Sequence, residues 1–322
     1  MRDENSRLRA VAWILLSGWM VGCGGSSGDA GGNVPDTGRA ADGEGALEAG
    51  RTAEGGGASE AGDAGTTLVT DGSSDGTGVD GPGTPAALSP TVAPGGNFDL
   101  SVWELQLPTG SPGAPTTIAP AALEGPNGFQ NADFFTDTKD GAMTFFDPEN
   151  GVTTANSDYP RSELREMNAD GTVANWAVAG TNTLSATLAV VQVPDHVCVG
   201  QIHLGTAIEA GLAASTKPLL ELYYHSSGVI ELGIEDSPAG TQTLHTIATV
   251  PLGTKFSYTI QLTGAGTIML VLDGTSSTFT MPASFDGYGM YFKAGDYDQT
   301  ADADAGAAVG ATVKFYALNV SH

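Results

Sequence analysis

Cationic side chains are scarce in this sequence. Its 322 residues include 12 Lys and Arg against 37 Asp and Glu, which gives a formal net charge of −25 at pH 7. Proteins that bind nucleic acid or an anionic lipid surface through charge need the opposite balance. The composition therefore argues against both partners, and it suits a polyanionic ligand only where the few cations gather in one place.

Cysteine is nearly absent as well. Cys23 and Cys198 are the two cysteines of the chain, and no zinc-type spacing of Cys and His occurs. Cys198 stands between two valines, so we expect a buried small apolar side chain rather than a nucleophile. The sequence therefore predicts neither a metal nor a cofactor.

Long hydrophobic runs are missing too. The apolar stretch at residues 11–21 is too short to cross a membrane and follows three arginines, so it predicts a signal peptide over residues 1–22. It ends with a small residue before Cys23, which resembles a bacterial lipoprotein signal and predicts that Cys23 is lipidated. A plain secretory signal is the alternative. We expect an exported protein, held at the outer membrane or cell surface by the lipid on Cys23 or otherwise secreted.

Two regions follow the predicted signal peptide. Residues 23–94 consist mainly of Gly, Ala, Ser, Thr and acidic residues. Such a segment cannot bury enough apolar surface to offset its loss of conformational entropy, so we predict a disordered acidic linker. Residues 95–322 have the length of one domain with a sizeable core, which we expect to be monomeric.

The domain reads as all-β. Runs of β-branched and aromatic residues alternate with Gly, Pro, Asn and Asp, and a helical period is almost absent, which favours a β-jelly roll or two-sheet antiparallel sandwich. A short helix is expected near residues 120–123 or 212–215. The predicted strands cover residues 98–108, 142–146, 161–167, 183–192, 197–204, 219–224, 229–234, 256–263, 267–273, 289–294 and 312–320.

One predicted strand carries polar residues at every second position, which places them on one face. Within residues 288–300, Tyr291, Lys293, Gly295 and Tyr297 share a face that has no aliphatic side chain. A solvent-facing polar row and a binding surface both fit this pattern.

The segment RSELRE at residues 161–166 gives a second such face. Arg161, Glu163 and Arg165 lie on one side, whereas Leu164 points into the core. The row is either an exposed ion-pair ladder, which contributes little stability, or a pair of guanidinium groups held by Glu163 to bind carboxylates.

A third face comes from the strand at residues 197–204. Gln201 and His203 share one side, and Cys198, Ile202 and Leu204 are expected on the opposite, apolar side. A lone histidine is most often structural, but the company of an amide and of the two cationic faces favours a functional role.

Together these faces match removal of a proton α to a carboxylate with loss of a leaving group at the β carbon. Cations and amide donors such as Arg161 and Gln201 would neutralise the carboxylate so that enolate-like charge can develop. His203 and Tyr297 would carry the protons, with no metal required. Such a cluster would let an acidic domain bind a polyanion.

The motifs RSELRE, QIH and YFKAGDYDQ, in this order, resemble the three signature motifs of the alginate lyases of polysaccharide lyase family 7. The opening NFDLSVWELQLPTG resembles that family as well, so the similarity spans residues 95–322. The resemblance implies a β-jelly roll whose concave sheet binds alginate, a polymer of mannuronate and guluronate, and cleaves it by β-elimination to leave unsaturated uronate ends.

The resemblance also implies roles for individual residues. Tyr297 would act as general acid, and as base when the C5 proton lies on the side of the leaving oxygen. His203 would be the base when that proton lies opposite, as in guluronate, and Ile202 resembles members that accept guluronate-containing blocks. The implied catalytic residues are Arg161, Gln201, His203 and Tyr297, and the implied substrate-binding or orienting residues are Glu163, Arg165, Tyr291, Lys293 and Gln299.

The last motif departs from the family pattern. The family usually has Tyr-Asn-Gln, whereas this chain has Tyr297-Asp298-Gln299, and Asp296 replaces an apolar residue. We expect these two carboxylates to raise the pKa of Tyr297 or to repel a polyanion.

Three other interpretations remain open. A glycoside hydrolase would need two carboxylates across the bond, yet mainly Glu163 is expected on this face. A carbohydrate-binding module would need exposed aromatic platforms, whereas Trp103 and Trp176 are expected in the core. The acidic residues at 296, 298, 302 and 304 suggest a calcium site or, more simply, a solvated loop.

Overall fold

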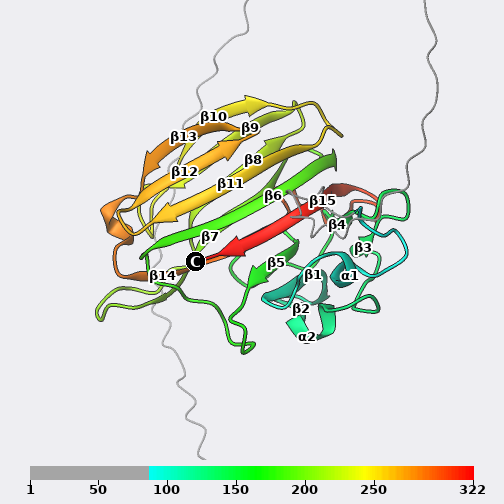
Figure 1. The fold of residues 1–322 in the computed structure, drawn as a ribbon, viewed down its shortest axis with the longest axis horizontal. Helices are drawn as coiled ribbons and strands as arrows, with labels where there is room; N and C mark the ends of the chain where they lie inside the picture. The colour runs from blue at the N-terminus through cyan, green and yellow to red at the C-terminus, as the bar shows by residue number, and fades with distance from the viewer. Residues whose placement is uncertain (1–86) are drawn as a thin grey trace, which may run out of the picture. The chain divides into compact units, whose positions relative to one another are not determined.

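The computed structural model describes residues 87–322, which form two antiparallel β-sheets stacked on each other (Figure 1). The predicted signal peptide, Cys23 and the linker up to residue 86 lie outside this range. In the described part, the predicted sandwich is confirmed. No helix between residues 87 and 322 has the length and apolar character needed to cross a membrane.

The first sheet has eight strands and provides the face that matters for function. Its order is β10-β9-β8-β7-β14-β5-β1-β2, so β7, β14 and β5 are neighbours at its centre. Its strands are β1 (Trp103–Ser111), β2 (Ala114–Ile118), β5 (Ser162–Glu166), β7 (His196–Ala207), β8 (Pro218–His225), β9 (Val229–Glu235), β10 (Gln242–Thr249) and β14 (Tyr288–Asp298).

The second sheet has seven strands in the order β13-β12-β11-β6-β15-β4-β3 and closes the other side of the core. Its strands are β3 (Phe134–Thr136), β4 (Met143–Pro148), β6 (Thr181–Gln192), β11 (Phe256–Thr263), β12 (Thr267–Leu272), β13 (Thr275–Thr280) and β15 (Gly310–Ser321). The short helices are α1 (Pro94–Asn97), α2 (Pro120–Leu123) and the 3₁₀ turn η1 (Ala283–Phe285).

Every predicted strand overlaps an observed one, but four observed strands were not predicted. Strands β2, β3, β10 and β13 are the outer strands of the two sheets. β10 and β13 have mostly polar, exposed residues, and β3 has three residues, so none shows an apolar alternation. The helix expected at residues 120–123 is present as α2, whereas residues 212–215 are not helical.

The core lies between the sheets and follows the two-residue period of the strands. In β11, Phe256, Tyr258, Ile260 and Leu262 are buried and alternate with partly exposed residues. Each such side chain contributes about 2 kcal/mol when it leaves water. Trp103 is buried as predicted.

Trp176 differs from the prediction because it is only partly buried at the edge of the core. Its indole Nε1 donates a hydrogen bond of 2.9 Å to Glu166 Oε2, and the indole ring lies 5.1 Å from the Phe292 ring. The polar end of the indole thus finds a carboxylate acceptor, which a fully apolar site would not supply.

The folded part starts earlier than residue 95. Leu88 packs against the core, Ala93 is 2% exposed, and the Ser89 amide donates to Asn97 Oδ1 at 2.8 Å. The last residues of the segment predicted as linker therefore belong to the domain, because they carry apolar side chains that the sheet edge can bury.

Candidate functional site

One cavity lies on the outer face of the eight-stranded sheet and has a volume of about 560 Å³. Its lining crosses the sheet from β2 to β9 and includes residues of the loop at 154–159. Eight residues singled out in the sequence line it, so the three predicted faces do come together: Arg161, Arg165, Gln201, His203, Tyr291, Lys293, Tyr297 and Gln299.

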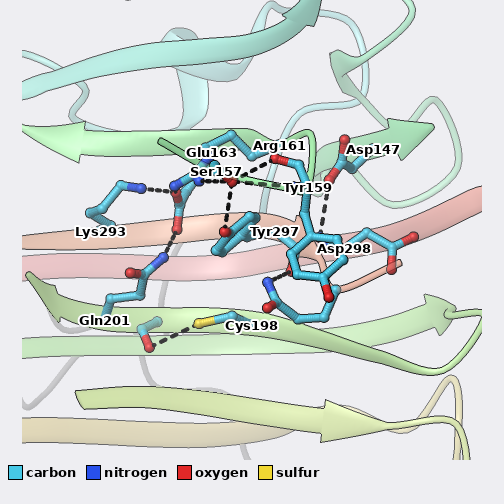
Figure 2. A network of polar contacts seen from close by, with 12 residues as sticks. Asp147, Ser157, Tyr159, Arg161, Glu163, Cys198, Gln201, Lys293, Tyr297 and Asp298 are labelled. Carbon is cyan, nitrogen blue, oxygen red and sulfur yellow. Dashed lines mark hydrogen bonds and ion pairs between the residues drawn. The ribbon is translucent and has the colours of Figure 1, made fainter. Parts of the chain in front are cut away.

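Glu163 lies at the bottom of this cluster and has no exposed surface. Gln201 Nε2 donates to Glu163 Oε1 at 2.6 Å, Arg161 Nη1 lies 3.4 Å from Oε2, and Lys293 Nζ pairs with the same oxygen (Figure 2). A buried carboxylate that carries its charge needs such partners, because an unpaired buried charge is strongly destabilising. Glu163 therefore orients the residues above it and does not itself face the cavity.

Arg161 and Tyr297 form one wall of the cavity. The guanidinium carbon of Arg161 lies 3.7 Å from the centre of the Tyr297 ring, which is a cation–π contact. Ser157 Oγ lies 3.0 Å from both Arg161 Nη2 and Tyr297 Oη, so it bridges the two. Tyr159 adds an edge-to-face contact with Tyr297, at 6.4 Å between ring centres.

Ser157 and Tyr159 were not identified from the sequence. They lie in the loop before β5, where no strand period indicates which side chains face the site. Their closeness to Arg161 in the sequence is the one available signal.

His203 forms the opposite wall. Its Nδ1 donates to the Leu204 carbonyl at 2.8 Å, because a carbonyl can only accept. Its ring stacks on Tyr291 at 5.0 Å, and Arg165 lies 4.4 Å from the centre of the Tyr291 ring. Burial, together with nearby Lys293, lowers the pKa of His203 to about 3. The imidazole is therefore neutral at pH 7, with Nε2 as an acceptor.

Tyr297 and Lys293 are both protonated at neutral pH. Burial raises the pKa of Tyr297 above its usual value, although Arg161 and Ser157 oppose the change. Burial and Arg161 lower the pKa of Lys293 to about 8, against the opposing effect of Glu163. The cavity thus holds a neutral base, a phenol with its proton and a cation close to losing its own.

Gly295 allows the central strands to approach closely. Its φ is 155°, and a Cβ at this position would lie 2.7 Å from Glu163 Cα. Any other residue would push β14 away from β5. The glycine in the YFKAG motif therefore keeps Lys293 beside Glu163.

The predicted orientation of Cys198 is wrong. Val197 and Val199 belong to the core cluster with Ile202, whereas Cys198 does not. A β-bulge between Cys198 and Gly200 interrupts the alternation of β7. Odd-numbered residues therefore point into the core before the bulge, and even-numbered residues do so after it. The thiol is nevertheless buried as predicted, and burial raises its pKa.

The predicted effect of Asp296 and Asp298 on Tyr297 is also wrong. Both are fully buried on the face of β14 opposite to Tyr297, and the Asp298 amide donates to Asp147 Oδ2 at 3.0 Å (Figure 2). Burial is the main cause of the raised Tyr297 pKa, and its acidic neighbours are Glu221 and Glu163. Sequence neighbours on a strand face opposite sides.

The four acidic residues considered for calcium do not share a surface. Asp296 and Asp298 are buried, whereas Asp302 and Asp304 are exposed. Within residues 87–322, no group of three or more His, Cys, Asp or Glu has an arrangement suited to a metal ion.

Two buried carboxylates at the cavity were missed. Glu221 on β8 and Glu235 on β9 are 7% and 3% exposed and line the cavity. The expectation that Glu163 is the main carboxylate on this face is therefore wrong. The pattern Leu220-Glu221-Leu222, with an acid between two core residues, was the signal for the first of them.

The domain is similar to known alginate lyases. The family model described as alginate lyase matches residues 98–322. A curated alginate lyase from Klebsiella pneumoniae is 31% identical over 288 residues, which cover 71% of this chain and 91% of the relative.

Solved structures of alginate lyases are also similar to this chain. A Pseudomonas aeruginosa alginate lyase superposes with a TM-score of 0.62 at 30% identity, covering 70% of this chain and 99% of the other. Alginate lyase A1-II′, a member of polysaccharide lyase family 7, has a TM-score of 0.62 at 34% identity, covering 71% and 98%.

The buried acids behind Tyr297 lead to a prediction about stability. Burial raises the pKa of Asp298 to about 6, so the folded state holds this proton more tightly than the unfolded state. The resulting stability is present at low pH and is lost as pH rises from about 4 through about 6. Asp298→Asn keeps an oxygen for the Thr300 amide and hydroxyl, which now bond to Oδ1, but carries no charge.

We therefore expect Asp298→Asn to raise the melting temperature at pH 8 and to change it little at pH 4. Thermal unfolding across this range measures the difference, and the exposed Asp286→Asn is the matched control. Equal melting temperatures of wild type and Asp298→Asn at pH 8 would contradict the assigned burial cost.

Proposed function

The chain belongs to the alginate lyases of polysaccharide lyase family 7, and we propose that it cleaves alginate by β-elimination in the cavity over β5, β7 and β14. The observation that carries the proposal is the pairing of a neutral His203 with a protonated Tyr297 around one cluster of cations. Elimination needs one group that takes a proton and one that gives a proton.

The first requirement is to neutralise the uronate carboxylate. The proton at C5 is weakly acidic while that carboxylate is charged, and the enolate-like intermediate concentrates charge on the same oxygens. Arg161 and Gln201 line the cavity and are held by Glu163, so their donors are fixed before substrate binds. Fixed donors stabilise developing charge without reorganising during the reaction.

The second requirement is proton transfer. The Nδ1–H of His203 is engaged by the Leu204 carbonyl, which leaves Nε2 to accept the C5 proton. Tyr297 Oη, with Ser157 beside it, protonates the departing glycosidic oxygen. When the C5 proton lies on the same side as the leaving oxygen, Tyr297 serves as the base as well. It must then first lose its phenolic proton to solvent, so that the phenolate takes the C5 proton and passes it to the departing oxygen.

We also propose a preference for guluronate-containing blocks, for which the supporting points are the Ile202 resemblance and a related enzyme. A variant of A1-II′ with one Tyr replaced by Phe was crystallised with a product written GGG. A variant with a His also replaced was crystallised with a substrate written GGMG. In guluronate the proton and leaving group lie on opposite sides, which suits separate His203 and Tyr297 roles.

The roles of His203 and Tyr297 are tested by substitution. We expect His203→Ala to lower kcat on polyguluronate at least about 100-fold, because positioned acid–base groups contribute 10²–10⁴-fold. Tyr297→Phe should lower kcat similarly on polyguluronate and polymannuronate. The readout is the ultraviolet absorbance of the unsaturated uronate, which elimination forms and hydrolysis does not.

Two substitutions outside the cavity serve as controls: His245→Ala on β10 and Tyr316→Phe on β15. Near-normal rates in both site variants would disprove the assigned roles. Absence of any absorbance rise with the wild type, with binding of alginate intact, would indicate a binding module instead.

The pKa of Lys293 predicts the alkaline side of the pH profile. Above about pH 8 the ammonium loses its proton and one cation near the bound uronate disappears. We expect kcat/KM to fall as pH rises through 8, whereas Lys293→Arg keeps its charge and its activity to higher pH. A wild-type profile that stays level to pH 9.5, or a variant with an unchanged fall, would exclude Lys293 as the cause.

A further inference from the structure

We propose that Glu221 and Glu235 make one end of the groove reject uronate carboxylates and accept sugar hydroxyls, so that polymer binding is limited on that side. The inference rests on the proposed function. It names two specificity-determining residues outside the predicted motifs, and it follows from how charge is distributed across the sheet.

The sign of charge changes across the cavity. Going from β5 to β9, three of the lining cations, Arg161, Arg165 and Lys293, lie on or directly before β5 and on β14, and the fourth, Lys217, lies directly before β8. Glu221 and Glu235 lie on β8 and β9, beyond β7 in the strand order. Gln201 and His203 of β7 stand at the boundary, so the proposed site of cleavage coincides with the change of sign.

Glu221 is fixed directly beside the catalytic strand. Its backbone pairs with that of Gln201, and its Oε2 accepts hydrogen bonds from Tyr223 Oη at 2.6 Å and Gln242 Nε2 at 2.5 Å. Two donors on one oxygen hold the group in place and favour a carboxylate, even though burial raises its pKa. A carboxylate can accept from a sugar hydroxyl but repels a uronate.

Glu235 extends the acidic end by one strand. Its Oε1 lies 3.2 Å from Lys217 Nζ, but the lysine side chain is 44% exposed and so offsets the negative charge only weakly. A polyuronate crossing the sheet therefore meets three cations around β5 and β14. Among the described lining residues of the β8 and β9 side it meets one, Lys217, which is already paired with Glu235. Units on this side must turn their carboxylates to solvent.

The test compares substrates of increasing length. Wild type and the Glu221→Gln/Glu235→Gln double variant of the full chain are assayed by absorbance on alginate oligomers of defined size at low ionic strength. We expect the gain in kcat/KM to increase with length and to reach about five-fold on long chains, because like charges across an interface disfavour binding strongly. Added salt should diminish the gain.

Glu231→Gln is the matched control. It lies on the same strand as Glu235 and removes the same charge, but it pairs with His225 at 3.1 Å and does not line the cavity. The Glu235→Gln single variant avoids disturbing the Tyr223 and Gln242 contacts. The inference is overturned if the double and single variants gain nothing on long chains, or if Glu231→Gln gains as much.

Binding separates this inference from the proposed function. Dissociation constants of the same oligomers, measured by calorimetry, report the rejection of carboxylates even if the wild type cleaves nothing. If the wild type cleaves nothing but the double variant binds long oligomers more tightly than the wild type does, lyase activity is disproved. The inference that Glu221 and Glu235 reject carboxylates is then supported. If the wild type cleaves alginate but the variants bind and cleave oligomers of every length as the wild type does, the proposed lyase function stands and the inference about Glu221 and Glu235 is disproved.

Discussion

The buried carboxylate of Glu163 is the interaction on which the site depends. It brings together an amide from β7, a guanidinium from the residue before β5 and an ammonium from β14. An unpaired charge at this depth would be costly, so the three strands must hold their partners in register. The pairing also holds the cationic groups of Arg161 and Lys293, which would otherwise repel each other, around the Glu163 carboxylate. The arrangement of the side chains on the cavity face thus follows from the need to pair the Glu163 carboxylate.

This local balance explains how an acidic domain can act on a polyanion. Three cations are concentrated in the cavity where we propose that the uronate carboxylate binds, and Arg161 and Arg165 lie against tyrosine rings. The aromatic faces hold Arg161 and Arg165 without neutralising them, whereas additional carboxylates would. Under the proposals above, the remaining acidic surface would restrict binding of the polyanion to this cavity, and the acids of β8 and β9 would limit binding at one end of it.

Strand periodicity predicted the face of Gln201, His203 and Tyr297, although the pairing of β7 and β14 shifts in register close to each of them. It also predicted the face of Arg161, which lies directly before β5. It failed at Cys198, where a bulge resets the phase, and a bulge leaves no mark in composition. Glu221 was missed as well. Its position between Leu220 and Leu222 indicates the outer face of β8, but its place beside Gln201 depends on the register in which β8 pairs with β7. The outer strands were missed because exposed polar strands lack an apolar alternation.

β14 contributes to both the cavity and a cluster of buried acids. One of its faces carries Tyr291, Lys293 and Tyr297, and the other buries Asp296 and Asp298 against Asp147. The carboxyl oxygens of Asp296 have no hydrogen-bond partner within the described residues, and burial raises the pKa of this group well above the usual range. Such a cluster disfavours the folded state as the carboxyls ionise, and it can persist because β5 and β7 pair with β14 on both sides. The same two neighbours that position the cavity face therefore also keep this acidic cluster buried, so loss of either pairing would affect stability and the proposed catalysis together.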